Sequence, residues 1–319
     1  MQFMQQERRE HGNSAPTVGQ KQAVLMLLLA AFFWGSGNVA NKTVLQDVDP
    51  IAAVALRSAI AFVALLPFAF RELLGVFSLS VWVKAAVLPA ALFAIALLLQ
   101  QWGYQQATVT NASFLVNTGS CLTPMIAFVV LRERLPRCFA AAVGLTLFGA
   151  FLMSGAGRSL GAMNVGDMAC LVSAAFYAGW IVALSRYAMR HGCPLSVTCF
   201  QCGLTLVLAI VLLMLFHPSQ PGTIVGALPE ALYLGVFSTA IAFGLTAAAQ
   251  EKVSASTAAV LLAAESLFGA AGGIWMLGER PETLAMFGAC AMILAIFIVA
   301  RAPASPASNI IFYDISDKG

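Results

Sequence analysis

Charged side chains are scarce in this chain of 319 residues: only 10% of the residues are Asp, Glu, Lys or Arg, whereas 60% are hydrophobic. A soluble domain carries about 25% charged and about 45–50% apolar residues. So few charges cannot cover a surface that faces water, which excludes a soluble globular protein. The same composition excludes intrinsic disorder and a disulfide-stapled secreted fold.

Histidine is also scarce, and this limits the possible chemistry. His11, His191 and His217 fall in terminal or loop segments, and the sequence contains neither a His-Glu-x-x-His pair nor a P-loop. A primary pump is therefore excluded, and an intramembrane enzyme lacks the catalytic groups it would need. The seven cysteines lie mostly within apolar runs, where Cys behaves as a small apolar residue. We expect no catalytic residue, no metal and no cofactor.

What the sequence does have is long apolar runs, such as residues 23–33 and 204–216. An outer-membrane barrel would instead alternate polar and apolar residues in segments of about ten. At about 20 residues per membrane span, the Pro, Gly and charged residues divide the chain into ten spans. We place spans 1 to 10 at residues 22–42, 51–70, 83–103, 108–131, 137–155, 165–188, 195–216, 228–249, 254–277 and 283–301. The predicted fold class is an all-α polytopic membrane protein with ten transmembrane helices.

The distribution of Lys and Arg predicts an orientation, because cytoplasmic loops carry an excess of both. With the N-terminus inside, thirteen of the 17 basic residues fall on the inner side, three fall outside and Arg57 lies within a span. The inner residues are Arg8, Arg9, Lys21, Arg71, Lys84, Arg132, Arg134, Arg137, Arg186, Arg190, Lys252, Arg301 and Lys318, and the outer ones are Lys42, Arg158 and Arg280. We predict a multi-pass protein of the plasma (inner) membrane with both termini in the cytoplasm. The polar N-terminal segment shows no signal-peptide cleavage site, so the first span should act as an uncleaved anchor.

Two halves of the sequence superpose when one is shifted by 146 residues, which places Trp34 on Trp180. At the same shift, residues 107–115 fall on 253–261 and 131–134 fall on 277–280. Each half holds five spans, an odd number, so the halves should insert in opposite orientations, as in secondary transporters. The predicted domains are a cytoplasmic N-terminal tail (1–21), two five-helix repeats (22–156 and 165–301) and a cytoplasmic C-terminal tail (302–319).

Three motifs carry a resemblance to a known family. They are Trp34-Gly35-x-x-Asn38-x-x-x-Lys42 in span 1, Leu122-Thr-Pro124 leading to Leu131-x-Glu133-Arg134-Leu-Pro, and the second copy Leu277-Gly-Glu279-Arg280-Pro. Over about residues 22–301 the chain resembles the EamA family of the drug/metabolite transporter superfamily, and within it the exporters of aromatic and other neutral amino acids (YddG-like). The resemblance implies two inverted five-helix repeats around a central cavity that is lined mainly by spans 1, 3, 4, 6, 8 and 9. Because the second copy has Ala270 where the first has Pro124, we expect a proline kink in one half only.

Aromatic and amide residues within the spans are candidates for substrate binding, because a buried polar group in lipid needs a partner. Trp34 and Asn38 share one face of span 1, and Tyr177 and Trp180 share one face of span 6. Such residues on facing helices would stack on a substrate and hydrogen-bond its polar end. In the alternative interpretation, the aromatics lie in the interfacial belt and Asn38 bonds a neighbouring helix.

Further candidates for substrate binding are Gln100 and Tyr104 in span 3 and Asn117 in span 4. Gln100 and Tyr104 lie in a segment rich in amides and aromatics near the outer boundary, where anchoring in the belt is the alternative to a cavity mouth. Asn117 belongs to a stripe of small polar residues between positions 110 and 120, which serves either close helix packing or the cavity.

Two charges lie inside predicted spans. Arg57 is about 10 Å into span 2 and Glu265 is about 16 Å into span 9, near the midplane, at 1.5 Å per residue. Such a charge costs about 2.5–3.5 kcal/mol on insertion scales, so neither is expected to face lipid. Arg57 either snorkels to the outer interface, is paired structurally or is functional. Glu265 would meet a substrate ammonium group or carry a proton.

These patterns predict a secondary transporter that exports small metabolites by alternating access, and the family resemblance implies that the metabolites are amino acids of the aromatic or neutral kind. The alternatives are a nucleotide-sugar or drug transporter of the same superfamily, a channel, or an intramembrane enzyme. A phosphate-bearing substrate would need several basic residues in the cavity, and the spans offer few. The expected partners are a small-molecule substrate and the lipid bilayer, with no nucleic acid. The oligomeric state stays open, and the sequence is compatible with a monomer.

Overall fold

The computed structural model describes residues 18–76, 78–107, 112, 115–133, 137–153, 164–216, 227–277 and 283–301. Several predicted features lie outside the described residues. These are most of the N-terminal tail, the C-terminal tail, Thr110, Ser113, Arg134 and the turn at residues 278–281.

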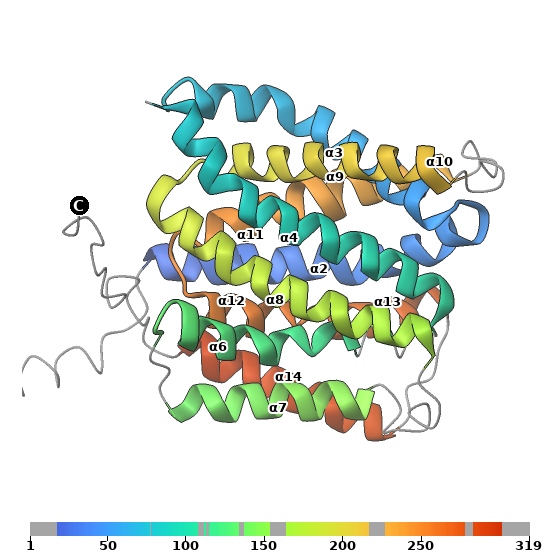
Figure 1. The fold of residues 1–319 in the computed structure, drawn as a ribbon. Helices are drawn as coiled ribbons and strands as arrows, with labels where there is room; N and C mark the ends of the chain where they lie inside the picture. Colours follow the sequence, from blue (N-terminus) through green and yellow to red (C-terminus); the bar gives the residue numbers. More distant parts are fainter. Residues whose placement is uncertain are drawn as a thin grey trace, which may run out of the picture.

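Helices are the only regular secondary structure in the described part of the chain (Figure 1). They are α2 (Val18–Asp47), α3 (Pro50–Leu73), α4 (Leu79–Gln106), α6 (Gly119–Val130), α7 (Arg137–Met153), α8 (Val165–His191), α9 (Pro194–Phe216), α10 (Leu228–Tyr233), η1 (Leu234–Ile241), α11 (Ala242–Ala249), α12 (Ala255–Leu262), α13 (Glu265–Leu277) and α14 (Thr283–Arg301). Among the described residues, eight helical segments are long and apolar enough to cross a membrane, and the apolar helices at Leu115–Val130 and Cys138–Met153 are shorter. The chain is therefore a multi-pass helical membrane protein. Each predicted span overlaps one of these ten segments.

Local sequence explains where several helices begin and end. The Asp49 side chain accepts hydrogen bonds from two backbone N–H groups in the first turn of α3, and Pro50 occupies a position where no N–H is needed. α8 begins with a capping box, in which Asn164 and Asp167 each accept a hydrogen bond from the other's backbone N–H. Beyond the end of α8, Gly192 has a φ of 61°, a left-handed conformation that glycine adopts without strain.

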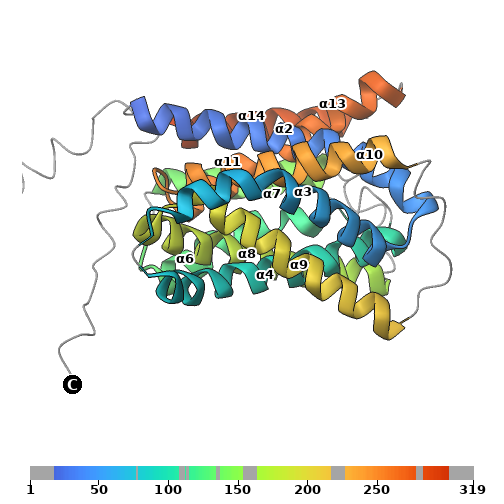
Figure 2. The same cartoon turned by 90° about the horizontal axis from the view of Figure 1, so that it is seen from above.

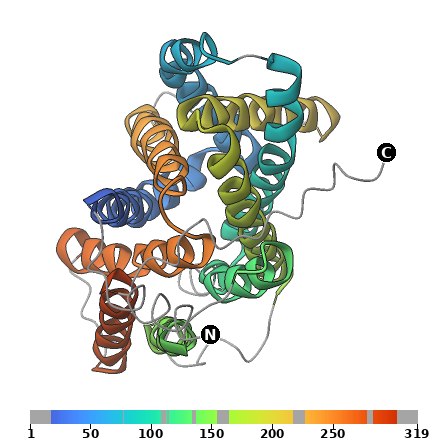
Figure 3. The same ribbon diagram turned by 90° about the vertical axis from the view of Figure 1, so that its left-hand side faces the viewer.

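Helices from the two halves of the sequence pack against each other. α3 lies against α9, α4 lies against α8 and α7 lies against α14. The α10–η1–α11 segment packs along α2, and α6 contacts α12. Figure 1 shows α4 beside α8 and α7 beside α14, Figure 2 shows α10 and α11 alongside α2, and Figure 3 shows α7 and α14 together at one flank of the bundle. The two halves therefore share one core.

The outer surface carries large apolar side chains. Trp275 is 89% exposed, and Val129 and Phe216 are 74% and 69% exposed. An apolar surface of this extent would drive association in water, whereas lipid tails cover it without cost. Polar side chains such as those of Gln101 and Thr239 are buried inside the bundle instead. This inside-out distribution fits a protein embedded in a bilayer.

Three of the predicted spans are interrupted, which the apolar pattern did not predict. In span 8 the segment Leu234–Ile241 is a π-helix, and the Thr239 hydroxyl donates to the carbonyl five residues earlier (2.7 Å). Span 9 breaks at Ala263 and Ala264, between α12 and α13, and a turn at Thr118 precedes α6 in span 4. The shift of 146 residues places Thr118 on Ala264, so two of the interruptions occupy matching positions in the halves.

Tertiary packing, and not local propensity, accounts for the break in span 9, because alanine is the best helix former. α2 crosses α13 at this point. A Cβ atom on Gly35 would lie only 2.6 Å from the carbonyl oxygen of Glu265, so the two backbones are nearly in contact. In span 4 the interruption lies ahead of Pro124, which is inside α6. The proline expected to kink one half therefore does not explain an interruption that both halves share.

Candidate functional site

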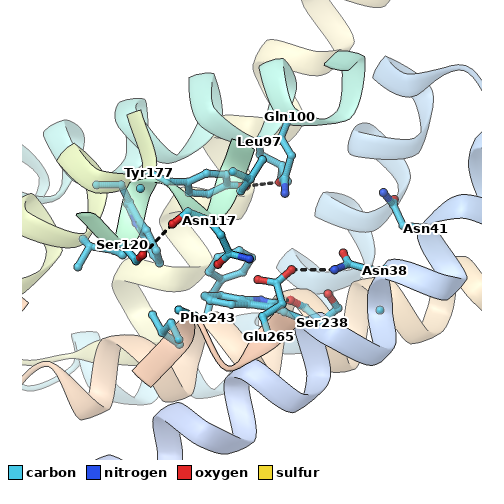
Figure 4. Close-up of a pocket in the computed structure, with 18 of the residues that line it drawn as sticks. Asn38, Asn41, Leu97, Gln100, Asn117, Ser120, Tyr177, Ser238, Phe243 and Glu265 are labelled. Atoms are coloured by element: carbon cyan, nitrogen blue, oxygen red, sulfur yellow. Dashed lines mark hydrogen bonds between the residues drawn. The ribbon is translucent and has the colours of Figure 1, made fainter. Parts of the chain in front are cut away.

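A cavity lies at the centre of the bundle, and Figure 4 shows side chains that line it. Its lining comes from α2, α4, α6, α8, η1, α11, α12 and α13, with one residue from α3; among the described residues, α7 and α14 contribute none. Seven of the eight residues predicted for substrate binding line it: Trp34, Asn38, Gln100, Asn117, Tyr177, Trp180 and Glu265.

Tyr104 is the predicted binding residue that does not line this cavity. Its side chain is 7% exposed and packs with Ala112, Leu115 and Cys170. α4 and α8 approach closely here, since a Cβ atom on Gly103 would lie 2.6 Å from the sulfur of Cys170. Tyr104 is therefore part of the packing between α4 and α8.

Three aromatic rings form an apolar wall of the cavity. The Phe243 ring lies 4.8 Å from the Trp34 ring and 5.4 Å from the Trp180 ring, measured between centroids. Both indole N–H groups are already bonded within the protein: Trp34 donates to the Ser238 carbonyl and Trp180 donates to the Gln201 side chain, each at 2.9 Å. The rings therefore offer a substrate their apolar surfaces, suited to stacking.

Glu265 lies at the start of α13, directly after the interruption in span 9, and faces the cavity. Its Oε1 accepts a hydrogen bond of 2.9 Å from Asn38 Nδ2 of α2 (Figure 4). Asn38 thus both lines the cavity and bonds a neighbouring helix, so the two interpretations of this residue are compatible. Next to it, Asn117 donates to the hydroxyl of Ser266, which connects the two matching helix interruptions.

Two further amide contacts fix other polar side chains of the cavity. The Tyr177 hydroxyl donates to Gln100 Oε1 at 2.7 Å (Figure 4). Asn41 and Gln101 exchange two hydrogen bonds of 3.2 and 2.5 Å. Because these groups hold one another in place, the polar surface of the cavity is preorganised.

Arg57 extends from α3 to the cavity and does not snorkel to the interface. The residue is 6% exposed. Its Nε donates to the Thr239 hydroxyl at 3.0 Å, and its Nη2 donates to the Ser238 hydroxyl at 3.4 Å. Both partners belong to the π-helical segment η1. The buried guanidinium is therefore held by neutral hydroxyls.

The sequence reasoning missed several lining residues, Phe243 and Ser238 above all. The repeat contained a usable signal for Phe243. The shift of 146 residues places it on Leu97, and both residues line the cavity. Ser238 carries no comparable signal, because its position depends on the π-helical register of η1.

Glu133 of the doubled Glu-Arg motif lies outside the cavity, beyond the end of α6. Its side chain is 7% exposed, and neither carboxylate oxygen has a hydrogen bond of normal geometry. Burial raises the pKa of this carboxyl above its ordinary value, and the nearby Ser254 and Ser256 at the start of α12 offset part of that effect. A buried carboxylate without full compensation destabilises the fold.

Glu133→Gln should therefore stabilise the protein at neutral pH, by about 2 °C or more in melting temperature. A carboxyl whose pKa is raised on folding binds its proton more tightly in the folded state, so stability falls as the pH rises from 4.5 through the raised pKa. The amide has no such penalty. The advantage of Glu133→Gln should be largest above the raised pKa and disappear below about pH 4.5.

Thermal unfolding of the detergent-purified protein between pH 4 and 8 measures this difference. Asp47→Asn is the matched control, since it makes the same change on an exposed side chain at the end of α2. A lower melting temperature for Glu133→Gln at pH 7.5 would show that the carboxylate stabilises the start of α12.

Comparison with known proteins adds independent findings. The model of the EamA-like transporter family matches the chain twice, over residues 21–155 and 164–301. An uncharacterized transporter of Archaeoglobus fulgidus is 27% identical over 286 residues, which cover 89% of this chain and 88% of the relative. The uncharacterized transporter YwfM of Bacillus subtilis is 26% identical over 289 residues, covering 88% of this chain and 94% of YwfM. A protein crystal structure with 18% sequence identity superposes with a TM-score of 0.72, covering 86% of this chain and 95% of that one, which shows a shared fold.

Proposed function

Because the chain belongs to the EamA-like transporter family, which matches both of its halves, we propose that this membrane transporter exports aromatic or other neutral amino acids by alternating access. Membership in a family of transporters favours transport over catalysis. The observation that carries the substrate proposal is the composition of the cavity. One wall is aromatic, and a carboxylate and a guanidinium, Glu265 and Arg57, face the same space.

The charges in the cavity favour a zwitterionic or neutral cargo over a phosphate-bearing one. Among the described lining residues, Arg57 is the only cation. A nucleotide sugar carries several phosphate charges, and proteins bind phosphate with clusters of basic groups and backbone N–H donors. The aromatic rings of Trp34, Trp180 and Phe243 suit an apolar or aromatic side chain.

We further propose ten spans in two inverted five-helix repeats, over residues 22–156 and 165–301. Five pairs of residues that are related by the shift of 146 both line the cavity: Trp34 and Trp180, Leu97 and Phe243, Val116 and Leu262, Asn117 and Ala263, and Gly119 and Glu265. Helix packing has the same relation, because α4 against α8 corresponds to the α10–η1–α11 segment against α2. These pairs support a pseudo-two-fold axis that passes through the cavity.

We also propose that the protein lies in the plasma (inner) membrane and that both of its termini lie in the cytoplasm. The end of the bundle that contains the start of α2 also contains Arg71, Arg190 and Lys252. A Cβ atom on Gly19 would lie 3.7 Å from the Lys252 side chain, and Glu72 accepts a hydrogen bond from the Ser196 backbone N–H at 2.8 Å. This basic end is the one expected to face the cytoplasm.

Labelling with a membrane-impermeant thiol reagent tests this orientation. In a variant without the seven native cysteines, Glu282→Cys should react in intact cells, because its segment is expected outside. Ser305→Cys should react only after the membrane is permeabilised. The reverse pattern would refute the orientation.

Transport in proteoliposomes tests the substrate. We expect uptake of radiolabelled phenylalanine, tryptophan or leucine above the level of protein-free liposomes, measured with and without a pH gradient. A labelled nucleotide sugar should not accumulate. Accumulation of the nucleotide sugar with no transport of any amino acid would replace the proposal with its alternative.

A further inference from the structure

Arg57 forms no direct ion pair within the described part of the chain, although it is among the most deeply buried charged side chains there. Two of its nitrogens bond to the hydroxyls of Thr239 and Ser238. No hydrogen bond to its Nη1 and no ion pair to any carboxylate are present in the described residues. Neutral hydroxyls orient a guanidinium without cancelling its charge, and a buried charge without a counter-ion is costly.

Glu265 does not fill this role. It interacts electrostatically with Arg57 across the cavity, but its hydrogen bond goes to Asn38 of α2. The two charged side chains line the same cavity, and each forms its hydrogen bonds with other residues. An anionic group in that space would gain a partner that the protein itself does not supply.

The geometry points to a new assignment: we propose that Arg57 is the carboxylate-binding residue of the cavity, oriented by Ser238 and Thr239 of η1. A guanidinium presents its N–H donors as a planar fork that matches the two oxygens of a carboxylate. A single guanidinium facing an acidic side chain suits a monocarboxylate and not a phosphate.

This inference deepens the proposed function and rests on it for the rest of the ligand. An amino acid would place its carboxylate on Arg57, its ammonium on Glu265 and its side chain against Trp34, Phe243 and Trp180. The polar groups then fix the orientation of the cargo, and the aromatic wall determines which side chains fit.

The experiment compares two probes, 3-phenylpropionate and 3-phenylpropanamide, which differ only in that a neutral amide replaces the carboxylate. Binding to the detergent-purified protein is followed by tryptophan fluorescence, since Trp34 and Trp180 line the cavity. The wild type should bind the carboxylate at least about tenfold more tightly than the amide, as expected for a charge-assisted hydrogen bond. Equal binding of the two probes would overturn the assignment.

Variants test whether Arg57 causes this preference for the carboxylate probe over the amide probe. Arg57→Gln should reduce it to about twofold or less, whereas Arg71→Gln, the same change on an exposed residue near the end of α3, should leave it unchanged. Glu265→Gln should preserve or increase it, because an acidic neighbour that repels the carboxylate is removed. A folded Arg57→Gln protein that keeps the full preference would refute the proposal. If Arg57→Gln does not fold, Arg57→Lys decides, because it keeps the charge but loses the planar fork: a reduced preference supports the proposal and an unchanged one contradicts it.

The two probes lack an ammonium group, so the result does not depend on amino-acid transport. A carboxylate preference that requires Arg57, with no transport of amino acids in proteoliposomes, would support this assignment and refute the proposed cargo. Amino-acid transport with equal binding of the two probes would support the proposed cargo and refute the assignment of Arg57.

Discussion

Glu265→Gln is expected to reduce transport by at least about tenfold, because a charge-assisted contact contributes about 1.5–3 kcal/mol and each 1.4 kcal/mol corresponds to a factor of ten. Glutamine keeps the size of the side chain and still accepts a hydrogen bond from Asn38, whose Nδ2 lies 2.9 Å from Oε1 of the acid. The folded state should therefore persist. What disappears is the negative charge that a substrate ammonium would meet.

Initial rates of amino-acid uptake between pH 5 and 8 measure this effect. Glu251→Gln makes the same substitution at an exposed position between α11 and α12 and should leave the rates unchanged. Rates equal to wild type across this pH range in Glu265→Gln would show that the carboxylate serves only the hydrogen bond to α2.

Gly35→Ala is expected to lower both stability and transport, because the position has no space for a methyl group. The added Cβ would lie 2.6 Å from the Glu265 carbonyl oxygen, 2.7 Å from the Gly269 backbone nitrogen and 2.8 Å from the Phe268 Cβ. Backbone atoms cannot rotate away, so α2 and α13 must separate, and overpacking of this kind costs about 1–3 kcal/mol. The separation would also move Asn38 away from Glu265.

Gly144→Ala is the matched control for Gly35→Ala. A Cβ atom on Gly144 of α7 meets nothing within 4 Å, and alanine favours a helix by about 1 kcal/mol over glycine. The control should therefore melt at the same temperature or higher, while Gly35→Ala melts several degrees lower and transports at least about tenfold more slowly. A Gly35→Ala protein with the stability and rates of the control would mean that α2 and α13 tolerate a wider separation.

Helix periodicity in the sequence predicted which aromatic and amide side chains of one helix line the cavity. Trp34 and Asn38 are four residues apart and line the cavity together, as do Tyr177 and Trp180. The π-helical register of η1, the break ahead of Glu265 and the hydrogen bonds of Arg57 could not be predicted in this way. Each depends on contacts between segments far apart in the sequence, which periodicity within one helix does not record. Tyr104 does not line this cavity, and its packing at the contact between α4 and α8 also depends on segments far apart in the sequence.

Residues that are related by the shift of 146 match in chemistry at the apolar wall of the cavity and differ at its two charges. Trp34 with Trp180, and Leu97 with Phe243, form an apolar frame with equivalents in both halves. Arg57 and Glu265 do not follow this rule, because the shift of 146 places them on Gly203 and Gly119. The apolar residues have equivalents in both halves, whereas the two charges have none. A cavity of this kind would bind an asymmetric molecule in one orientation.

The length of α2 and α8 has a consequence for the membrane itself. At 1.5 Å per residue, α2 with 30 residues is about 45 Å long and α8 with 27 residues is about 40 Å long. A bilayer has a hydrocarbon core of about 30 Å. Both helices must therefore tilt or project into the headgroups. The thickness of the surrounding bilayer then sets part of the elastic energy in which the protein operates.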